Sequence, residues 1–258
     1  MGRPIVAIEE GMVIKSPQEL DVMRRAGKVV AFALAALQEG IRPGMRTREL
    51  DAIAEAEIRR HDAIPSFIGY RGFPASLCVS VNEEIVHGIP GDRVIQDGDI
   101  VSLDVGAIVD GFHGDAAVTV GVGQITSEAQ RLIDAARKAL VAGIEAARLG
   151  GRLGDVSAAI QSLAESRDYS VVREYVGHGI GRKMHEEPAV PNYGKPGRGI
   201  PLQQGMALAI EPMLNIGGWK TKVLNDNWTV VTEDRSLSAH FEHTIAITDL
   251  GPEVLTQL

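Results

Sequence analysis

The sequence predicts a domain of the α+β class, and three observations lead to this prediction. Two apolar runs rich in β-branched residues flank Asp110-Gly111 within residues 100–120, which is a strong signal for a β-hairpin. Apolar residues at helical spacing occur within residues 17–60 and again within residues 127–166. Short strand-like runs alternate with turns over the last third of the chain.

The helices of the first half are predicted from their ends. Ser16-Pro17-Gln18-Glu19 has the form of a capping box with proline at the first helical position. A helix is expected from there to about Gly40, because glycine favours a helix end. Thr47 is expected to cap a second helix that runs to about Arg60. A strand is then expected at residues 76–81.

The hairpin within residues 100–120 is expected to place two aspartates on one face. With Asp110 and Gly111 at the two central turn positions, Gly106 faces Asp115 across the hairpin. Asp104 is two residues from Gly106 and therefore shares the face of Asp115, with Cβ atoms about 7 Å apart. Two such carboxylates would repel each other unless a cation lay between them. A surface hairpin with two solvated aspartates is the alternative.

The second half is expected to begin with two helices, at about residues 127–148 and 155–166. A Pro/Gly-rich loop covers residues 189–205. The strand-like runs of this half lie at residues 171–177, 207–214, 228–232 and 241–248. His87-Gly88-Ile89 has a counterpart in His178-Gly179-Ile180, although the offsets between such pairs vary. This faint repeat favours two similar halves that close around a central site.

Composition and charge exclude several classes of protein. The chain has 258 residues, of which 45% are hydrophobic and 23% charged, as in soluble globular proteins. The net charge of -8 argues against a general nucleic-acid binder and against an anionic membrane surface. Cys78 is the one cysteine, which excludes an internal disulfide and a thiolate zinc site. No apolar run approaches the roughly 20 residues that span a bilayer, and the acidic N-terminus does not fit a signal peptide. A cytoplasmic protein is therefore expected.

Three further candidate ligands lie in the second half. His178 stands between two glycines at a predicted strand end, where the backbone can bend to aim the ring. Glu211 interrupts an apolar run directly before Pro212, which suggests a bulge or a strand end. Glu242 directly precedes a β-branched strand. Each residue taken alone also has a structural explanation.

Together with Asp104 and Asp115, these residues offer four carboxylates and one imidazole, without sulfur. Such a set suits Mn, Fe(II) or Co, with Zn as a further candidate. Its four negative charges balance two divalent cations. Two such ions, about 3.5 to 4 Å apart, can activate a water and polarise a carbonyl. Hydrolysis of an amide is the natural use of this chemistry, and a free amine that binds a metal would select a peptide N-terminus.

With these residues in their motifs, the sequence resembles the type I methionine aminopeptidases. The motifs that carry the resemblance are VHGIP (86–90), GFHGD (111–115), GHGIG (177–181), HEEP (185–188), EPM (211–213) and FEHT (241–244). The resemblance implies a pita-bread fold, with a curved antiparallel sheet, helices on its outer face and two halves related by a pseudo-twofold. It also implies a monomer. We expect a single catalytic domain at residues 16–258 after a lead-in at residues 1–15.

The resemblance further implies a role for each motif residue. Two divalent metal ions (Co, Mn, Fe(II) or Zn) would be bound by Asp104, Asp115, His178, Glu211 and Glu242. Asp115 and Glu242 would bridge the ions, and Glu211 would also act as the base. His185 would hold the peptide carbonyl or oxyanion, and His87 would contact the scissile amide and assist proton transfer to the leaving nitrogen. A structural role is expected for the remaining histidines, His61, His113, His240 and His243.

The same resemblance implies a pocket for a methionine side chain. The positions that would enclose it are Phe67, Tyr70, Phe73, Cys78, Met184 and Trp228. A thioether gains from contact with aromatic edges, whereas plain core packing is the alternative for these residues. Three positions depart from the common pattern of the family: Arg71 stands where a histidine is often found, Phe73 where many relatives have tyrosine, and Met184 where many have phenylalanine.

The function implied is removal of the initiator methionine from nascent polypeptides, with preference for a small second residue and with the ribosome as a candidate partner. Two alternatives remain open. Proline-directed peptidases share the ligand set and the fold, but they usually carry a large N-terminal domain. A non-catalytic binding or chaperone module of the same fold typically loses ligands, whereas all five are present here.

Overall fold

The computed structural model describes residues 12–258, so most of the lead-in expected at residues 1–15 lies outside the described part. Four helices are present within that part: α1 (Pro17–Gly40), α2 (Thr47–Arg60), α3 (Ser127–Ala146) and α4 (Leu153–Glu165). A short 3-10 turn, η1, covers Tyr70–Gly72. All four helices were expected from the sequence, with ends shifted by at most two residues.

The capping prediction is confirmed for α1 and wrong for α2. In α1 the Ser16 hydroxyl accepts from the backbone N–H of Glu19, and the Glu19 carboxylate accepts from the N–H of Ser16. Helix α2 is instead preceded by Arg46, whose N–H donates to the carboxylate of Glu49. The Thr47 hydroxyl is engaged elsewhere, because it exchanges hydrogen bonds with the backbone of Gly91.

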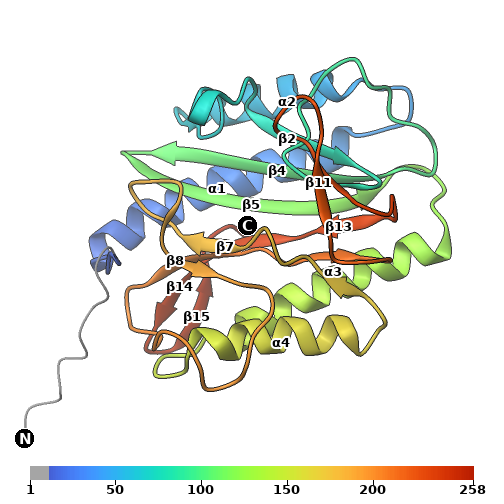
Figure 1. Cartoon of the computed structure of the whole chain (residues 1–258). Coiled ribbons are helices and arrows are strands. Elements are labelled where there is room, and N and C mark those ends of the chain that lie inside the picture. The colour runs from blue at the N-terminus through green and yellow to red at the C-terminus, as the bar shows by residue number, and fades with distance from the viewer. Residues whose placement is uncertain (1–11) are drawn as a thin grey trace, which may run out of the picture.

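One large antiparallel sheet forms the centre of the molecule (Figure 1). Its strands run in the order β1-β4-β5-β14-β9-β7-β8, while β2 pairs with β4 and β15 pairs with β14. The bounds are β1 (Ile64–Pro65), β2 (Leu77–Val81), β4 (Ile100–Val109), β5 (Phe112–Gly121), β7 (Gly177–Gly179), β8 (Glu186–Val190), β9 (Ala207–Ile210), β14 (Glu242–Thr248) and β15 (Gly251–Val254). Strand β14 joins the two halves, since it pairs with β5 on one side and with β9 on the other.

Two small sheets flank the large one. The first contains β6 (Ser170–Val171), β10 (Met213–Asn215) and β13 (Ser238–His240), and the second contains β3 (Glu84–Val86), β11 (Thr221–Val223) and β12 (Val230–Thr232). The single strand predicted at residues 171–177 is therefore wrong, because β6 and β7 belong to different sheets. The strand predicted at 207–214 is likewise divided into β9 and β10, and the break falls at Glu211-Pro212, as the proline suggested.

The helices cover one face of the large sheet, and alternation along the strands explains why. In β4, Val101, Leu103 and Val105 are fully buried in a cluster with residues of α1 and α2. A second cluster joins α3 and α4 to the same face of β9 and β14. Asp104 and Gly106 alternate with the buried residues of β4 and therefore point away from the helices. The two helix pairs thus leave the opposite face of the sheet free for other side chains.

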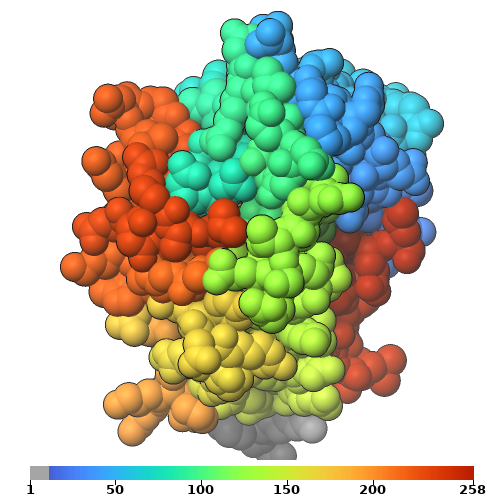
Figure 2. All heavy atoms as spheres, turned by 90° about the vertical axis from the view of Figure 1, so that its right-hand side faces the viewer, coloured from blue at the N-terminus to red at the C-terminus, as the bar shows by residue number. Residues whose placement is uncertain are grey.

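The segments near both ends of the described chain pack against the body. In Figure 2 the last strand region (dark red) lies against the blue N-terminal helix region. In agreement with this view, Gly27 of α1 lies so close to the backbone of Leu255 that a Cβ at residue 27 would have no room. At the other end, the buried ammonium of Lys15 forms an ion pair with Glu186 at 2.7 Å. Among the helices formed by residues 12–258, none combines the length and apolar character that crossing a bilayer requires.

Candidate functional site

The register of the β4–β5 hairpin is the one expected from the sequence. Gly106 is the partner of Asp115, and the turn falls at Asp110-Gly111, with both residues in the left-handed region. Asp104, two residues from Gly106, therefore shares a face with Asp115. This face is the one opposite to α1 and α2, so both carboxylates point away from the helices.

The ligands predicted in the second half reach the same face through strand pairing. Ala117, the partner of Asp104 in β5, is also the partner of Glu242 in β14. Glu211 directly follows β9 and continues the β9–β14 register toward Glu242. His178 of β7 lies opposite Ala209 of β9, one step further along the sheet. All five predicted ligands thus come together on one face of the sheet.

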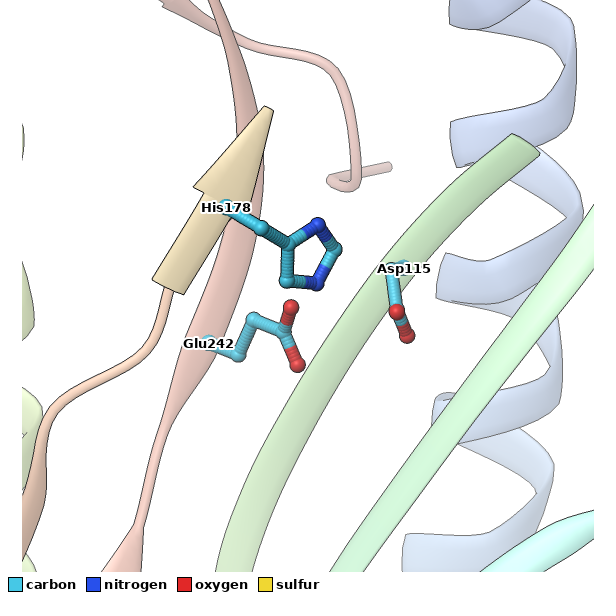
Figure 3. A group of neighbouring side chains, drawn as sticks. All are labelled: Asp115, His178 and Glu242. Atoms are coloured by element: carbon cyan, nitrogen blue, oxygen red, sulfur yellow. The ribbon is translucent and has the colours of Figure 1, made fainter. Parts of the chain in front are cut away.

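Three of these side chains converge at short range. Ligand atoms of Asp115, His178 and Glu242 all lie within 4.8 Å of one another, and Figure 3 shows them pointing together from β5, β7 and β14. The Nε2 atom of His178 lies 3.5 Å from a carboxylate oxygen of Glu211. The Nδ1–H of His178 donates to the carbonyl of Gly179 at 2.8 Å. The lone pair of Nε2 is therefore free to bind a metal ion.

The electrostatics of this cluster favour a bound cation. Burial raises the pKa of the Asp104 carboxyl to about 7, and burial together with mutual repulsion raises the pKa of Asp115, Glu211 and Glu242 well above the ordinary range. One carboxylate oxygen each of Asp104, Asp115 and Glu242 is buried without a hydrogen-bond partner within residues 12–258. Burial lowers the pKa of His178 to about 3, so its ring is neutral and able to bind a metal. Buried, unsatisfied oxygens beside a neutral imidazole fit divalent metal ions.

The cluster opens into a cavity of about 140 Å³. Its walls contain the five predicted ligands, both predicted catalytic histidines and all six residues of the predicted methionine pocket. The one further lining residue, among those the structure describes, is Arg71. The cavity therefore brings together the residues that were predicted to act together, and Arg71 lines it as well.

The apolar side of the cavity consists of aromatic edges and sulfur. Phe67 and Phe73 meet edge to face with centroids 6.5 Å apart, and Phe73 meets Trp228 in the same way at 5.1 Å. Cys78 and Met184 complete this cluster. A Cβ on Gly106 would lie 2.9 Å from the ring of Phe67, so the glycine beside the aspartates makes room for the aromatic wall.

Two histidines border the cavity on its polar side. The Nδ1 atom of His185 is hydrogen-bonded to the Tyr70 hydroxyl at 2.8 Å, and partial burial followed by the charge of Arg71 lowers the pKa of His185. His87 has a left-handed backbone conformation, with φ of 61°, which a residue with a side chain rarely adopts. Burial lowers the pKa of His87 to about 4, so both rings are neutral near pH 7.

The histidines expected to be structural differ in their surroundings. His61 stacks on Phe32, His113 bonds to Ser66, and His243 bonds to Thr256. His240 is different: it is buried, neither ring nitrogen has a hydrogen-bond partner among residues 12–258, and its Nε2 lies 3.9 Å from Glu211. This neighbour of a candidate ligand was not predicted from the sequence, although its position two residues before Glu242 was a usable signal.

Comparison with known proteins places this chain in a family. Residues 21–249 match the model of metallopeptidase family M24. The chain is 54% identical to the methionine aminopeptidase of Clostridium perfringens, over 95% of this chain and 98% of that protein. It is 52% identical to methionine aminopeptidase 1 of Bacillus subtilis, over 96% of this chain and 100% of that protein.

Solved structures agree with this result. The methionine aminopeptidase of Thermotoga maritima superposes with a TM-score of 0.94 at 47% identity and covers 96% of this chain and 100% of its own. The prolidase of Pyrococcus furiosus superposes with a TM-score of 0.77 at 23% identity, and this chain covers 66% of it, a likeness that shows the fold alone. The pita-bread fold expected from the sequence is confirmed.

Proposed function

Because the chain belongs to metallopeptidase family M24 and, within it, to the methionine aminopeptidases, we propose that it removes the N-terminal methionine from nascent proteins and peptides. The observation that carries this proposal is the junction of two surfaces in one cavity. Four largely buried carboxylates and a neutral imidazole form one side, and aromatic edges with two sulfur-containing side chains form the other. The first surface suits hydrolysis of an amide, and the second suits a thioether.

The proposed metal centre uses the five side chains that share one face of the sheet. Asp104, Asp115, His178, Glu211 and Glu242 would hold two divalent ions (Co, Mn, Fe(II) or Zn), with Asp115 and Glu242 as the bridging carboxylates. The donor set fits, because the charges of four carboxylates balance two divalent cations, and three of their oxygens have no hydrogen-bond partner in the described part of the chain. Such a pair of ions supplies an acidified water and a Lewis acid for the scissile carbonyl.

The protein's own groups would handle the protons. Glu211 is a suitable base, because burial and its carboxylate neighbours raise its affinity for a proton. We propose that the Tyr70 hydroxyl donates to Nδ1 of His185, which would place the proton of the neutral ring on Nε2. His185 can then donate an N–H to the carbonyl oxygen of the substrate. His87 lines the same cavity and has an unusual backbone conformation. It would assist proton transfer to the leaving nitrogen.

Tyr70→Phe tests this tautomer argument. Loss of the hydroxyl removes the hydrogen bond that fixes His185, and we expect kcat/KM for a Met-Ala peptide to fall by about tenfold. Tyr193→Phe is the matched control, since Tyr193 is exposed and does not line the cavity. Equal rates for the two variants in a methionine-release assay would show that the hydroxyl does not position His185.

We further propose that residues 16–258 form a single catalytic domain that acts as a cytoplasmic monomer on nascent chains at the ribosome. Support for one domain comes from the large sheet, which is continuous across both halves of the chain. A preference for a small second residue is part of the same proposal, and it predicts that a peptide with lysine in second place is not cleaved. A proline-directed peptidase is less well supported, because that likeness covers the fold alone.

Metal removal and replacement test the proposed function. After chelation, we expect no release of methionine from Met-Ala-Ser, and addition of Mn, Co, Fe(II) or Zn one at a time should restore it with at least one ion. Met-Lys-Ser should remain uncleaved under the same conditions, and so should an Xaa-Pro peptide. Release from the Xaa-Pro peptide alone would support a prolidase, and no release with any ion would support the non-catalytic alternative.

A further inference from the structure

The turn at Tyr70–Gly72 carries a positive charge to the cavity wall. Arg71 is exposed and, of the described residues that line the cavity, it is the one lysine or arginine. Within residues 12–258 its guanidinium forms no ion pair with a carboxylate of the protein. The positive charge of Arg71 is therefore available to the part of a bound ligand that extends out of the cavity.

The backbone holds this residue in a fixed and unusual conformation. Arg71 has a φ of 49°, in the left-handed region that favours glycine, and it lies between Gly69 and Gly72, with φ of 82° and 88°. The turn is closed by hydrogen bonds from Gly69 N–H to the Phe73 carbonyl and from Phe73 N–H to the Tyr70 carbonyl. Tyr70, the first residue of the turn, and Phe73, the residue after it, both line the cavity. The charge is thus attached to a constrained part of the site.

The guanidinium also lies near the polar side of the cavity, beside the tyrosine ring that contacts His185. Its Cζ is 5.4 Å from the centre of the Tyr70 ring, and the hydroxyl of that ring is bonded to His185. His185 is the residue proposed to hold the scissile carbonyl. If the methionine side chain occupies the apolar end, as the proposed function requires, the peptide beyond the scissile bond would pass the polar side, where Tyr70, Arg71 and His185 line the cavity.

The charge of Arg71 has no counterpart among the basic side chains that line the cavity. Under the proposed function, the four carboxylates of the cavity are balanced by two divalent ions. Among the described lining residues, Arg71 is then the lysine or arginine side chain that the cavity presents to the substrate.

We propose that Arg71 is a specificity-determining residue that binds a carboxylate in the peptide segment following the scissile bond. The carboxylate is either the side chain of an acidic third residue or the free C-terminus of a short peptide. This inference rests on the proposed function, since it assumes that peptides with N-terminal methionine occupy the cavity.

Three amidated tripeptides test it with the metal-loaded protein: Met-Ala-Glu, Met-Ala-Gln and Met-Ala-Lys. We expect kcat/KM to be about three- to fivefold higher for Glu than for Gln, and about tenfold higher than for Lys, because the contact is solvent-exposed. Most of the difference should lie in KM. The preference should weaken between about 0.05 M and about 0.5 M salt. Met-Ala-Gln with a free carboxyl, compared with its amide, measures the terminal carboxylate separately.

Variants at Arg71 give the decisive comparison. In Arg71→Gln the Glu-to-Lys ratio should approach one, in Arg71→Lys it should be partly kept, and in Arg71→Glu it should be inverted. Arg148→Gln, an exposed arginine outside the cavity, is the control for the loss of one positive charge and should keep the wild-type ratio. An unchanged ratio in Arg71→Gln would overturn the proposal, whereas failure of the wild type to cleave Met-Ala-Gln would contradict the proposed function instead.

Discussion

Asp104→Asn is expected to abolish most of the activity, with kcat/KM on Met-Ala-Ser reduced about 10³-fold. The amide keeps the shape of the side chain but removes one negative charge from the candidate metal ligands, and a lost charge at a metal centre costs several kcal/mol of transition-state stabilisation. The metal content of the purified variant should fall in parallel with its activity. Full activity in this variant would refute the assignment of Asp104 as a ligand.

Asp110→Asn in the same hairpin is the matched control. Asp110 is exposed at the turn, where it pairs with Arg25 at 2.7 Å, and asparagine tolerates its left-handed conformation. We expect wild-type metal content and wild-type rates in this variant. A loss equal to that of Asp104→Asn would mean that damage to the hairpin, rather than to the ligand, explains both results.

The metal-free protein gives a second readout for Asp104→Asn. The pKa of Asp104 is raised from 3.8 to about 7 by burial, so the folded state resists its ionisation. The contribution of Asp104 to the free energy of unfolding is therefore fully present below about pH 4, and it is lost as the pH rises through about 7. Asparagine does not ionise, so the variant avoids that loss. In urea unfolding without metal, the variant should exceed the wild type by on the order of 1 to 3 kcal/mol at pH 7 and match it near pH 4. Added metal should reverse the order at pH 7.

Glu211→Gln is expected to leave a folded protein with little turnover at saturating substrate. General acid–base groups contribute about 10²- to 10⁴-fold, and Glu211 is proposed as both ligand and base, so we expect kcat to fall by about 10³-fold. The KM for Met-Ala-Ser should change by only a few-fold, since the methionine pocket is built from other residues. The measurement is a steady-state assay in excess metal, which compensates for weaker binding of the ions.

Glu187→Gln is the control for the loss of a carboxylate near the site. Glu187 is exposed on β8, two residues after His185, and does not line the cavity. Wild-type kcat is expected for this variant. If Glu211→Gln also kept the wild-type kcat, its role as ligand and base would be wrong.

Much of this site could be predicted because sheet geometry is periodic. The turn at Asp110-Gly111 fixes the register of its hairpin, and a period of two residues then places Asp104 and Asp115 on one face. Pro212 marked the end of β9 next to Glu211 for a similarly local reason, since proline cannot donate to a strand ladder. The roles of residues such as His87, in contrast, came from resemblance to a family and not from local patterns.

What the sequence did not predict depends on contacts between distant segments. His240 and Glu211 are neighbours only because β13 and β10 pair in a small sheet. Resemblance to the family marked Arg71 as a departure at the methionine pocket, but its left-handed backbone conformation in the turn beside the cavity was not predicted. Residues 171–177 are divided between two sheets, yet residues 172–176, which separate β6 from β7, contain no proline or glycine that would predict the break. Non-local pairing of this kind is not encoded in a single stretch of sequence.

The central position of β14 has a consequence for how the protein is made. Glu242 is the last of the five candidate ligands in the chain, yet its strand lies between β5 and β9 and joins the two halves. During synthesis the β4–β5 hairpin emerges long before the strand that completes the sheet, with its two aspartates uncompensated. The site can therefore be assembled only after residue 242 has been translated. Metal ions captured at that moment would hold both halves together and stabilise the newly completed fold as a whole.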